Sequence, residues 1–336
     1  MGQNCSCLFG REKDESAGER DGAGAPVAFV GNRLLPDDFI LADSTRIDNE
    51  NGAGPFHCDS DGAPACDPQL QPASWCFSFA SEQGQRPYQE DTCSCAQSEH
   101  HLVVGIFDGH GGDIAAAYCA KELPRRVMAK LLSHAPEEAL GEAFAEVEHH
   151  FEVNQEKSGA AAVMVVVPRD HRDAIYCATL GDCQAMLVSR GVSNSPLDEK
   201  PSNMTIWTSA AQTMETERSR LEMGGFQIVT DGEGVVRFAG HQLSTPAALG
   251  DFWAGKKLEG VSATPSIEKI EGSAEMIILG SDGIFGPTRP TDVAQTARTL
   301  LSGYIHRHMM AQNDAMQKTT AELARKTVRD DNATVG

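Results

Sequence analysis

The feature that most constrains this chain is an apolar run that stops abruptly in a polar, glycine-rich stretch. Residues 102–112 read LVVGIFDGHGG, and such a run bounded by glycines predicts a buried strand that presents its last side chains at a site. Asp108 has a carboxylate suited to a hard divalent cation, the Gly109 carbonyl adds an oxygen, and the imidazole of His110 can move a proton. Taken alone, the same residues also fit a strand that ends in an ordinary polar turn.

The composition limits the classes of partner. The 336 residues include 48 acidic and 28 basic side chains, and a formal net charge of −20 would repel a phosphate backbone, so we expect no nucleic-acid partner. The longest apolar run, Ala160–Val167, is too short to span a bilayer. The ten cysteines form no tight framework and lack zinc-site spacing, which favours reduced thiols in an intracellular protein.

The first residues carry a motif for lipid attachment. Gly2, with a serine four residues later, fits the pattern for N-myristoylation, and Cys5 and Cys7 are placed for palmitoylation. Two acyl chains give stable anchoring, so we predict a cytoplasmic protein attached peripherally to a membrane; the alternative is a chance match in a flexible tail. Residues 1–73 are rich in Gly, Asp, Glu, Ala and Pro, which predicts a disordered tail before a folded domain at 74–336.

The order of the expected elements predicts an α+β fold. Besides the strand described above, strands are expected at 75–81, 158–167, 174–179, 185–189 and 274–279, a hairpin at 226–238, and helices at 113–133, 136–156, 214–225, 291–301 and 304–326. Pro124 should kink or split the first helix. Strands, then helices, then strands and helices again predict two mainly antiparallel sheets flanked by helices, a four-layer αββα sandwich.

Seven short motifs follow one another through the folded part. They are Arg86 with Glu90-Asp91, FDGHGG at 107–112, LGDC at 180–183, ERSRLEMGG at 217–225, ALGDF at 248–252, ILGSDGIFG at 278–286 and DDNATV at 330–335. In this order and spacing the chain resembles the metal-dependent serine/threonine protein phosphatases, the type 2C or PPM family. The resemblance implies hydrolysis of phosphoserine and phosphothreonine in protein substrates.

The resemblance also implies a set of metal ligands. Two Mg²⁺ or Mn²⁺ ions would be held by Asp108, which bridges them, and by Glu90, Gly109, Asp282 and Asp331. The residues alone support the same chemistry, because carboxylates from distant strand ends repel one another unless cations lie between them. Two ions that share a carboxylate lower the pKa of a bridging water and hold the oxygens of an in-line displacement.

Further residues receive roles from the same resemblance. Asp182 is placed for a weaker third ion, and Asp91 and Asn332 for positions behind the ligands. Arg86 would hold the substrate phosphate, although taken alone it fits an exposed charged turn better. His110 would protonate the departing serine or threonine oxygen.

The chain is expected to act as a monomer.

Several positions depart from the family pattern. They are SGAA at 158–161, an unrecognisable DHKP stretch at 208–214, Pro246-Ala247 in place of Ser-Arg, a short substrate-side flap at 253–261, Gly286 in place of an aspartate, and a final strand that is short or truncated at Gly336. None of these removes a proposed metal ligand. They favour a second hypothesis, a pseudophosphatase that keeps the fold as a scaffold or phosphoprotein-binding module.

Overall fold

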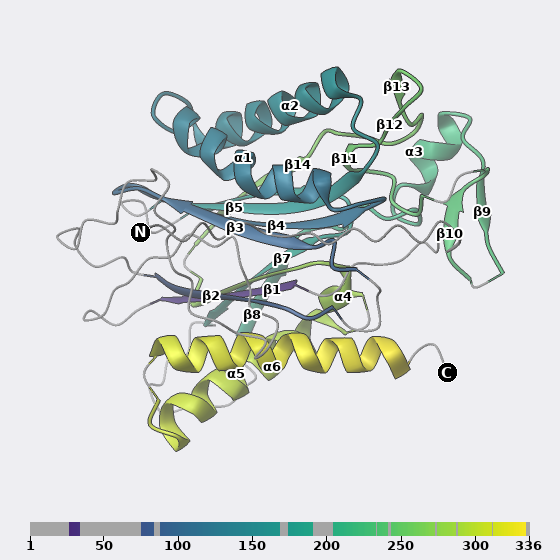
Figure 1. Ribbon diagram of the computed structural model, residues 1–336. Coiled ribbons are helices and arrows are strands. Elements are labelled where there is room, and N and C mark those ends of the chain that lie inside the picture. The colour runs from purple at the N-terminus through teal and green to yellow at the C-terminus, as the bar shows by residue number, and fades with distance from the viewer. Residues whose placement is uncertain are drawn as a thin grey trace, which may run out of the picture.

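Two antiparallel sheets lie face to face between two pairs of helices in the computed structural model (Figure 1). The structure describes residues 27–33, 75–83, 88–168, 174–190, 204–232, 234–240, 243–272, 274–286, 288–310 and 312–333. The predicted four-layer α+β sandwich is therefore confirmed for this part of the chain.

Each sheet is built from strands that are far apart in the sequence. The first has the order β2 (Trp75–Ser81), β1 (Val27–Arg33), β15 (Met276–Gly280), β7 (Gln184–Arg190) and β8 (Met204–Thr208). The second has the order β14 (Ser266–Glu271), β6 (Ala174–Leu180), β5 (Gly159–Pro168), β4 (His101–His110) and β3 (Thr92–Gln97), with β11 (Leu249–Gly250) also paired to β5. All of these neighbours are antiparallel.

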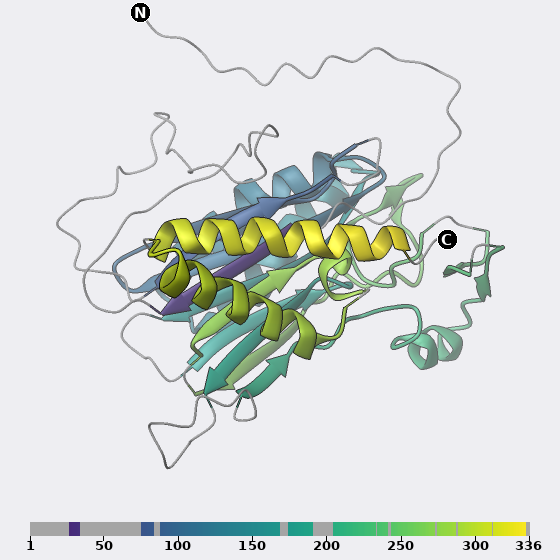
Figure 2. The ribbon, with the colours of Figure 1, turned by 90° about the horizontal axis from the view of Figure 1, so that it is seen from below.

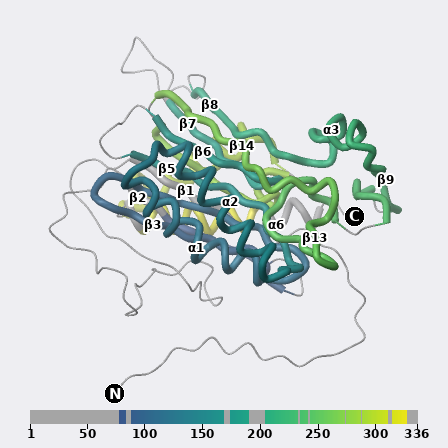
Figure 3. Tube along the Cα trace, turned by 90° about the horizontal axis from the view of Figure 1, so that it is seen from above, coloured from purple at the N-terminus to yellow at the C-terminus, as the bar shows by residue number. Residues whose placement is uncertain are grey.

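Helices cover the outer face of each sheet. The second sheet carries α1 (Ile114–Lys130) and α2 (Pro136–Asn154), and the first carries α5 (Pro290–Ser302) and α6 (Gln312–Ala333) (Figure 2). Smaller elements gather at one end of the sandwich (Figure 3); they are α3 (Arg218–Met223), β9 (Ile228–Thr230), β10 (Val236–Phe238), β12 (Phe252–Trp253) and β13 (Lys256–Lys257). Among the described residues, no helix is both long and apolar enough to cross a membrane.

The alternation of side chains along the strands creates three apolar layers. In β4, Val103 and Phe107 pack beneath α1 and α2, whereas Val104 faces the other sheet. In β15, Ile277 faces the space between the sheets and Ile278 packs against α5 and α6. Successive residues of a strand point to opposite faces, so strands covered on both sides read as continuous apolar runs. Full burial of each large side chain contributes about 1.5–3 kcal/mol.

Two expectations about the helices are corrected. α1 runs as one helix through Pro124, whose side chain is buried, so the proline does not split it. The last helix begins at Gln312 instead of Tyr304, which lies in a short π-helix, Gly303–Arg307. The Tyr304 hydroxyl donates a hydrogen bond to Glu322 at 2.5 Å, which ties this π-helix to α6.

β1 is the largest difference between the predicted and the observed fold. The disordered tail predicted for residues 1–73 does not hold for residues 27–33, which pair with both β2 and β15 inside a sheet. Val30, for example, lies between Ser78 and Ile278. The strand is short, and the sequence on either side of it is mostly polar, so no apolar pattern marks it. Its two partner strands lie far along the chain. The predicted lipidation sites near the N-terminus lie outside the described residues.

Removing β1 should destabilise the protein. Deleting residues 1–34 leaves β2 and β15 with unpaired backbone groups in the middle of a sheet, so we expect Tm to fall by about 10 °C or more in thermal unfolding followed by circular dichroism. Deleting residues 1–20 keeps β1 and should lower Tm by no more than about 2 °C. Equal melting temperatures for the two deletions would contradict this role of β1.

Candidate functional site

The polar ends of strands from both sheets meet at one end of the sandwich. β4 ends in Asp108, Gly109 and His110. Asp182 lies in the turn between β6 and β7, where the chain crosses from one sheet to the other. Asp282 lies two residues after the end of β15, as the first residue of α4 (Asp282–Phe285). The structure thus brings three of the predicted carboxylates and the predicted proton donor to the same end of the molecule.

The segment before β3 packs against the end of β4. One carboxylate oxygen of Glu90 accepts a hydrogen bond from the backbone N–H of Gly112 at 2.7 Å, which holds the glycine-rich turn against this segment. A Cβ on Gly109 would lie only 2.5 Å from the carbonyl oxygen of Glu90. Only glycine allows this close approach of two backbones, so the sequence DG at the end of β4 is a packing requirement as well as a chemical one.

Asp91 is the most deeply buried carboxylate of the group. Burial raises its pKa well above the ordinary value, and the negative charges of Asp282 and Asp182 raise it further, while interactions with the side chains of Asp108 and Ser281 act against this. Neither carboxylate oxygen of Asp91 has a hydrogen-bond donor in good geometry within the described part of the chain. A charged carboxylate in this position therefore costs free energy unless a cation or a proton neutralises it.

The donor set fits a hard divalent cation in its chemistry. All donors are carboxylate or carbonyl oxygens, which suit Mg²⁺ or Mn²⁺ rather than zinc. No three His, Cys, Asp or Glu side chains converge as a metal-binding group among the residues that the structure describes. Asp331 and Asn332 belong to α6, but their side chains lie outside the described part of the chain, as does all of Arg86. The proposed roles of these three residues stay predictions.

His110 is held by an aspartate to which the sequence alone assigned no role. Nε2 of His110 lies 3.0 Å from both carboxylate oxygens of Asp251, which is 141 residues further along the chain. Burial lowers the pKa of His110, but the charge and hydrogen bond of Asp251 outweigh this and raise it above the ordinary value. Asp251 belongs to the motif ALGDF at 248–252, so the sequence marked this position. Its contact with His110 becomes visible only in the folded chain.

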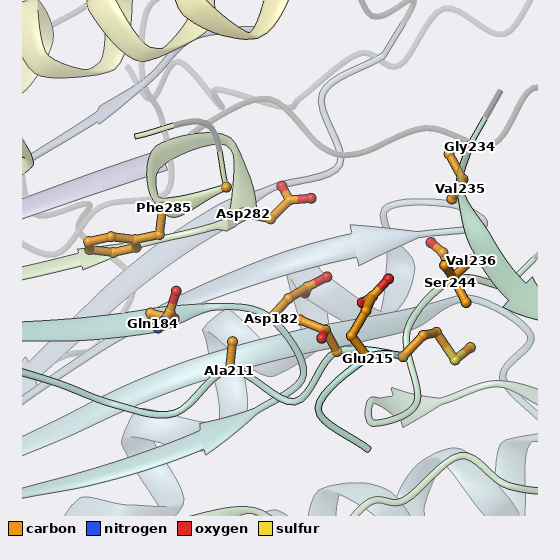
Figure 4. Close-up of a pocket in the computed structure, with 13 residues that line it drawn as sticks. Asp182, Gln184, Ala211, Glu215, Gly234, Val235, Val236, Ser244, Asp282 and Phe285 are labelled. Atoms are coloured by element: carbon orange, nitrogen blue, oxygen red, sulfur yellow. The ribbon is translucent and has the colours of Figure 1, made fainter. Parts of the chain in front are cut away.

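A cavity of about 380 Å³ lies beside Asp182 and Asp282. The carboxylates of these two residues and of Glu215 surround the same space, and residues 234–236 of the β9–β10 hairpin form the facing wall (Figure 4). The flap expected at 253–261 contributes no residue to this wall; it forms the β12–β13 hairpin and the turn after it.

The family comparison and the similar curated proteins point to the same family. The family described as "Protein phosphatase 2C" matches residues 77–331. "Probable protein phosphatase 2C 25" of Arabidopsis thaliana is 27% identical over 240 residues, which cover 68% of this chain and 56% of that protein. "Probable protein phosphatase 2C 54" of Oryza sativa subsp. japonica is 26% identical over 318 residues, which cover 86% and 80%. The chain spans about half the length, 56% and 49%, of the first two curated relatives.

Solved structures share the fold at low sequence identity. The structure of a C. elegans sex determining protein superposes with a TM-score of 0.57 at 20% identity, covering 74% of this chain and 65% of that one. A serine-threonine phosphatase 2C from Toxoplasma gondii superposes with a TM-score of 0.53 at 14% identity, covering 72% and 87%. These similarities support the αββα architecture and nothing finer.

The raised pKa of Asp91 leads to a test of the carboxylate group. In metal-free protein at about pH 7.5, Asp91→Asn should raise the free energy of unfolding by about 1–3 kcal/mol, because it removes an unsatisfied buried charge. Denaturant unfolding measures this difference. Asp292→Asn, which changes a half-exposed carboxylate on α5, is the control and should change little.

The pH dependence follows from the direction of the shift. A raised pKa means that the cost of charged Asp91 is complete above the folded pKa, shrinks as the pH falls below it and vanishes near the unfolded pKa, so the two proteins should become equally stable by about pH 4. An Asp91→Asn protein that is less stable than the unsubstituted chain in chelator would contradict this account of the site.

Proposed function

Since this chain belongs to the protein phosphatase 2C family, we propose that it is a metal-dependent protein serine/threonine phosphatase. The observation that carries the proposal is the meeting of carboxylates from both sheets, Asp108, Asp182 and Asp282, with His110 at one end of the sandwich. Hydrolysis of phosphate monoesters is among the slowest uncatalysed reactions, so it requires a site with strong electrostatic stabilisation. The proposed substrates are phosphoserine and phosphothreonine side chains of proteins.

The metal ligands are proposed from the family motif and supported by the chemistry of the site. The residues that would hold two Mg²⁺ or Mn²⁺ ions are Glu90, Asp108, Asp282, Asp331 and, through its carbonyl, Gly109. When bound, the ions would supply charge stabilisation to the transferring phosphoryl group and lower the pKa of a water beside it. Asp182 is proposed to hold a weaker third ion. The unsatisfied carboxylate of Asp91 supports a cation nearby.

The chain's own groups would bind the phosphate and move one proton. Arg86 is proposed to hold the phosphate oxygens through its guanidinium. As the bond between phosphorus and the serine or threonine oxygen breaks, His110 gives its proton to that oxygen. Cys183, the cysteine near the carboxylates, is unsuited to act as a nucleophile, because it is buried and its pKa is strongly raised; burial also raises the pKa of Cys177 to about 12. Direct attack by water is therefore proposed.

Phosphate release tests this function. The full chain should hydrolyse a phosphothreonine peptide with Mn²⁺ and lose turnover in chelator, and Asp108→Ala should lower kcat by at least about 100-fold because it removes a proposed metal ligand. Asp292→Asn should keep full activity. A folded chain that binds Mn²⁺ and hydrolyses no phosphopeptide would contradict the proposal and support the pseudophosphatase alternative.

We further propose that the protein is attached to the cytoplasmic side of a membrane through lipids on Gly2, Cys5 and Cys7. The support is the coincidence of a myristoylation motif with two nearby cysteines in the first seven residues. A single myristoyl chain gives only marginal binding, so a second acyl chain at a cysteine is needed for a stable anchor.

Membrane fractionation of eukaryotic cells tests this proposal. Unsubstituted protein should sediment with membranes, and Gly2→Ala should move most of it to the soluble fraction because it removes the acceptor of the first lipid. A double substitution, Cys5→Ser with Cys7→Ser, should leave weak, reversible binding. Membrane partition that is the same in the unsubstituted and Gly2→Ala proteins would overturn the lipid anchor.

A further inference from the structure

The chain makes an unusual turn immediately before Asp251. Gly250 and Asp251 both have left-handed backbone conformations, with φ values of +86° and +62°. A Cβ on Gly250 would collide with the carbonyl oxygen of Ser158, so glycine is required there. Asp251 is buried, and a non-glycine residue in this conformation persists only where its surroundings stabilise it. Such backbone strain, observed at a side chain that contacts His110, suggests a function.

A partly buried ion pair stabilises this turn from one side. One carboxylate oxygen of Glu148, on α2, lies 2.8 Å from Nζ of Lys257, on β13. The other accepts a hydrogen bond from the backbone N–H of Gly250 at 3.0 Å. Lys257 also donates to the carbonyl oxygens of Gly250 at 2.7 Å and Ala248 at 2.9 Å. Both charged groups thus form hydrogen bonds with the backbone that precedes Asp251.

Backbone contacts fix the other side of the turn. The N–H of Asp251 donates to the carbonyl of Ser158 at 3.1 Å, and its own carbonyl accepts from the N–H of Leu258 at 3.0 Å. Gly159 is the cross-strand partner of His110, and a Cβ there would collide with both His110 Nε2 and the Asp251 carboxylate. The strand pair, the turn and the ion pair therefore position one carboxylate against one nitrogen of the imidazole.

We propose that Asp251 is the positioning residue that orients His110 as the proton donor to the leaving group, a role that rests on the phosphatase activity proposed above. A carboxylate can only accept, so the nitrogen it contacts, Nε2, carries a hydrogen. Nδ1 is then the nitrogen left to give a proton to the departing oxygen. Its N–H bond breaks as the O–H bond of the released alcohol forms, and the imidazole is left neutral with its hydrogen on Nε2.

Two substrates with different leaving groups test this role. A phosphothreonine peptide releases an alkoxide that needs a proton, whereas p-nitrophenyl phosphate releases a stable phenolate that does not. Asp251→Asn preserves the size of the side chain, and asparagine tolerates a left-handed backbone, so the turn should survive. We expect kcat for the peptide to fall by about 100-fold, kcat for p-nitrophenyl phosphate by less than about 3-fold, and KM to change little.

Controls separate positioning from general damage. His110→Ala should show the same split between substrates, and the double substitution with Asp251→Asn should be no worse than His110→Ala alone. Asp292→Asn should change neither substrate. Equal losses for both substrates, or no loss for the peptide, would overturn the role of Asp251. An unsubstituted chain that hydrolyses neither substrate would instead contradict the phosphatase activity, and with it this role.

A measurement on metal-free protein tests the geometry without turnover. In ¹⁵N NMR spectra of the ring nitrogens, His110 of the unsubstituted chain should carry its hydrogen on Nε2. Asp251→Asn should remove this preference, because an amide can also donate to Nε2. An imidazole with its hydrogen on Nδ1 alone in the unsubstituted chain would overturn the proposal.

Discussion

Repulsion among carboxylates that share a partly buried site is the constraint on which this structure depends. Asp91, Asp108, Asp182 and Asp282 approach one another where both sheets end, and burial raises the pKa of Asp91 and of Asp182. Each uncompensated buried charge costs several kcal/mol, so the fold must supply that free energy elsewhere. The three apolar layers do so, and a bound cation would remove much of the cost. Stability and function are thus opposed at this end of the sandwich.

Local patterns explain which parts were predictable. The runs that form β4, β5 and β15 carry their own signals, because their apolar residues on both faces can be read without knowing the partner strands, and an Asp-Gly pair also lies at or just after the end of β4 and β15. β1 was not predictable, since it becomes a strand only by pairing with residues far along the chain. Asp251 was missed for the same reason: its role depends on His110, 141 residues away.

One departure from the family pattern, SGAA at 158–161, lies where the structure accommodates it. In SGAA at 158–161, Ser158 keeps its hydroxyl, which donates to Glu156 at 2.8 Å and accepts from the N–H of Ala115 at 3.0 Å. Ala160 and Ala161 are buried on opposite faces of β5, where methyl groups pack without needing hydrogen-bond partners. The changed residues therefore support the strand that lies beside the site and leave its carboxylates in place.

The central claim is that these carboxylates form a divalent metal site. Anomalous diffraction at the manganese edge, from crystals of the full chain grown with Mn²⁺, tests this most directly because it locates the ions. The account predicts anomalous peaks beside Asp108, with Glu90 and Asp282 among the ligands, because carboxylates from both sheets lie at this end of the sandwich. Well-ordered crystals with no manganese peak beside Asp108, or with peaks only elsewhere on the molecule, would contradict it.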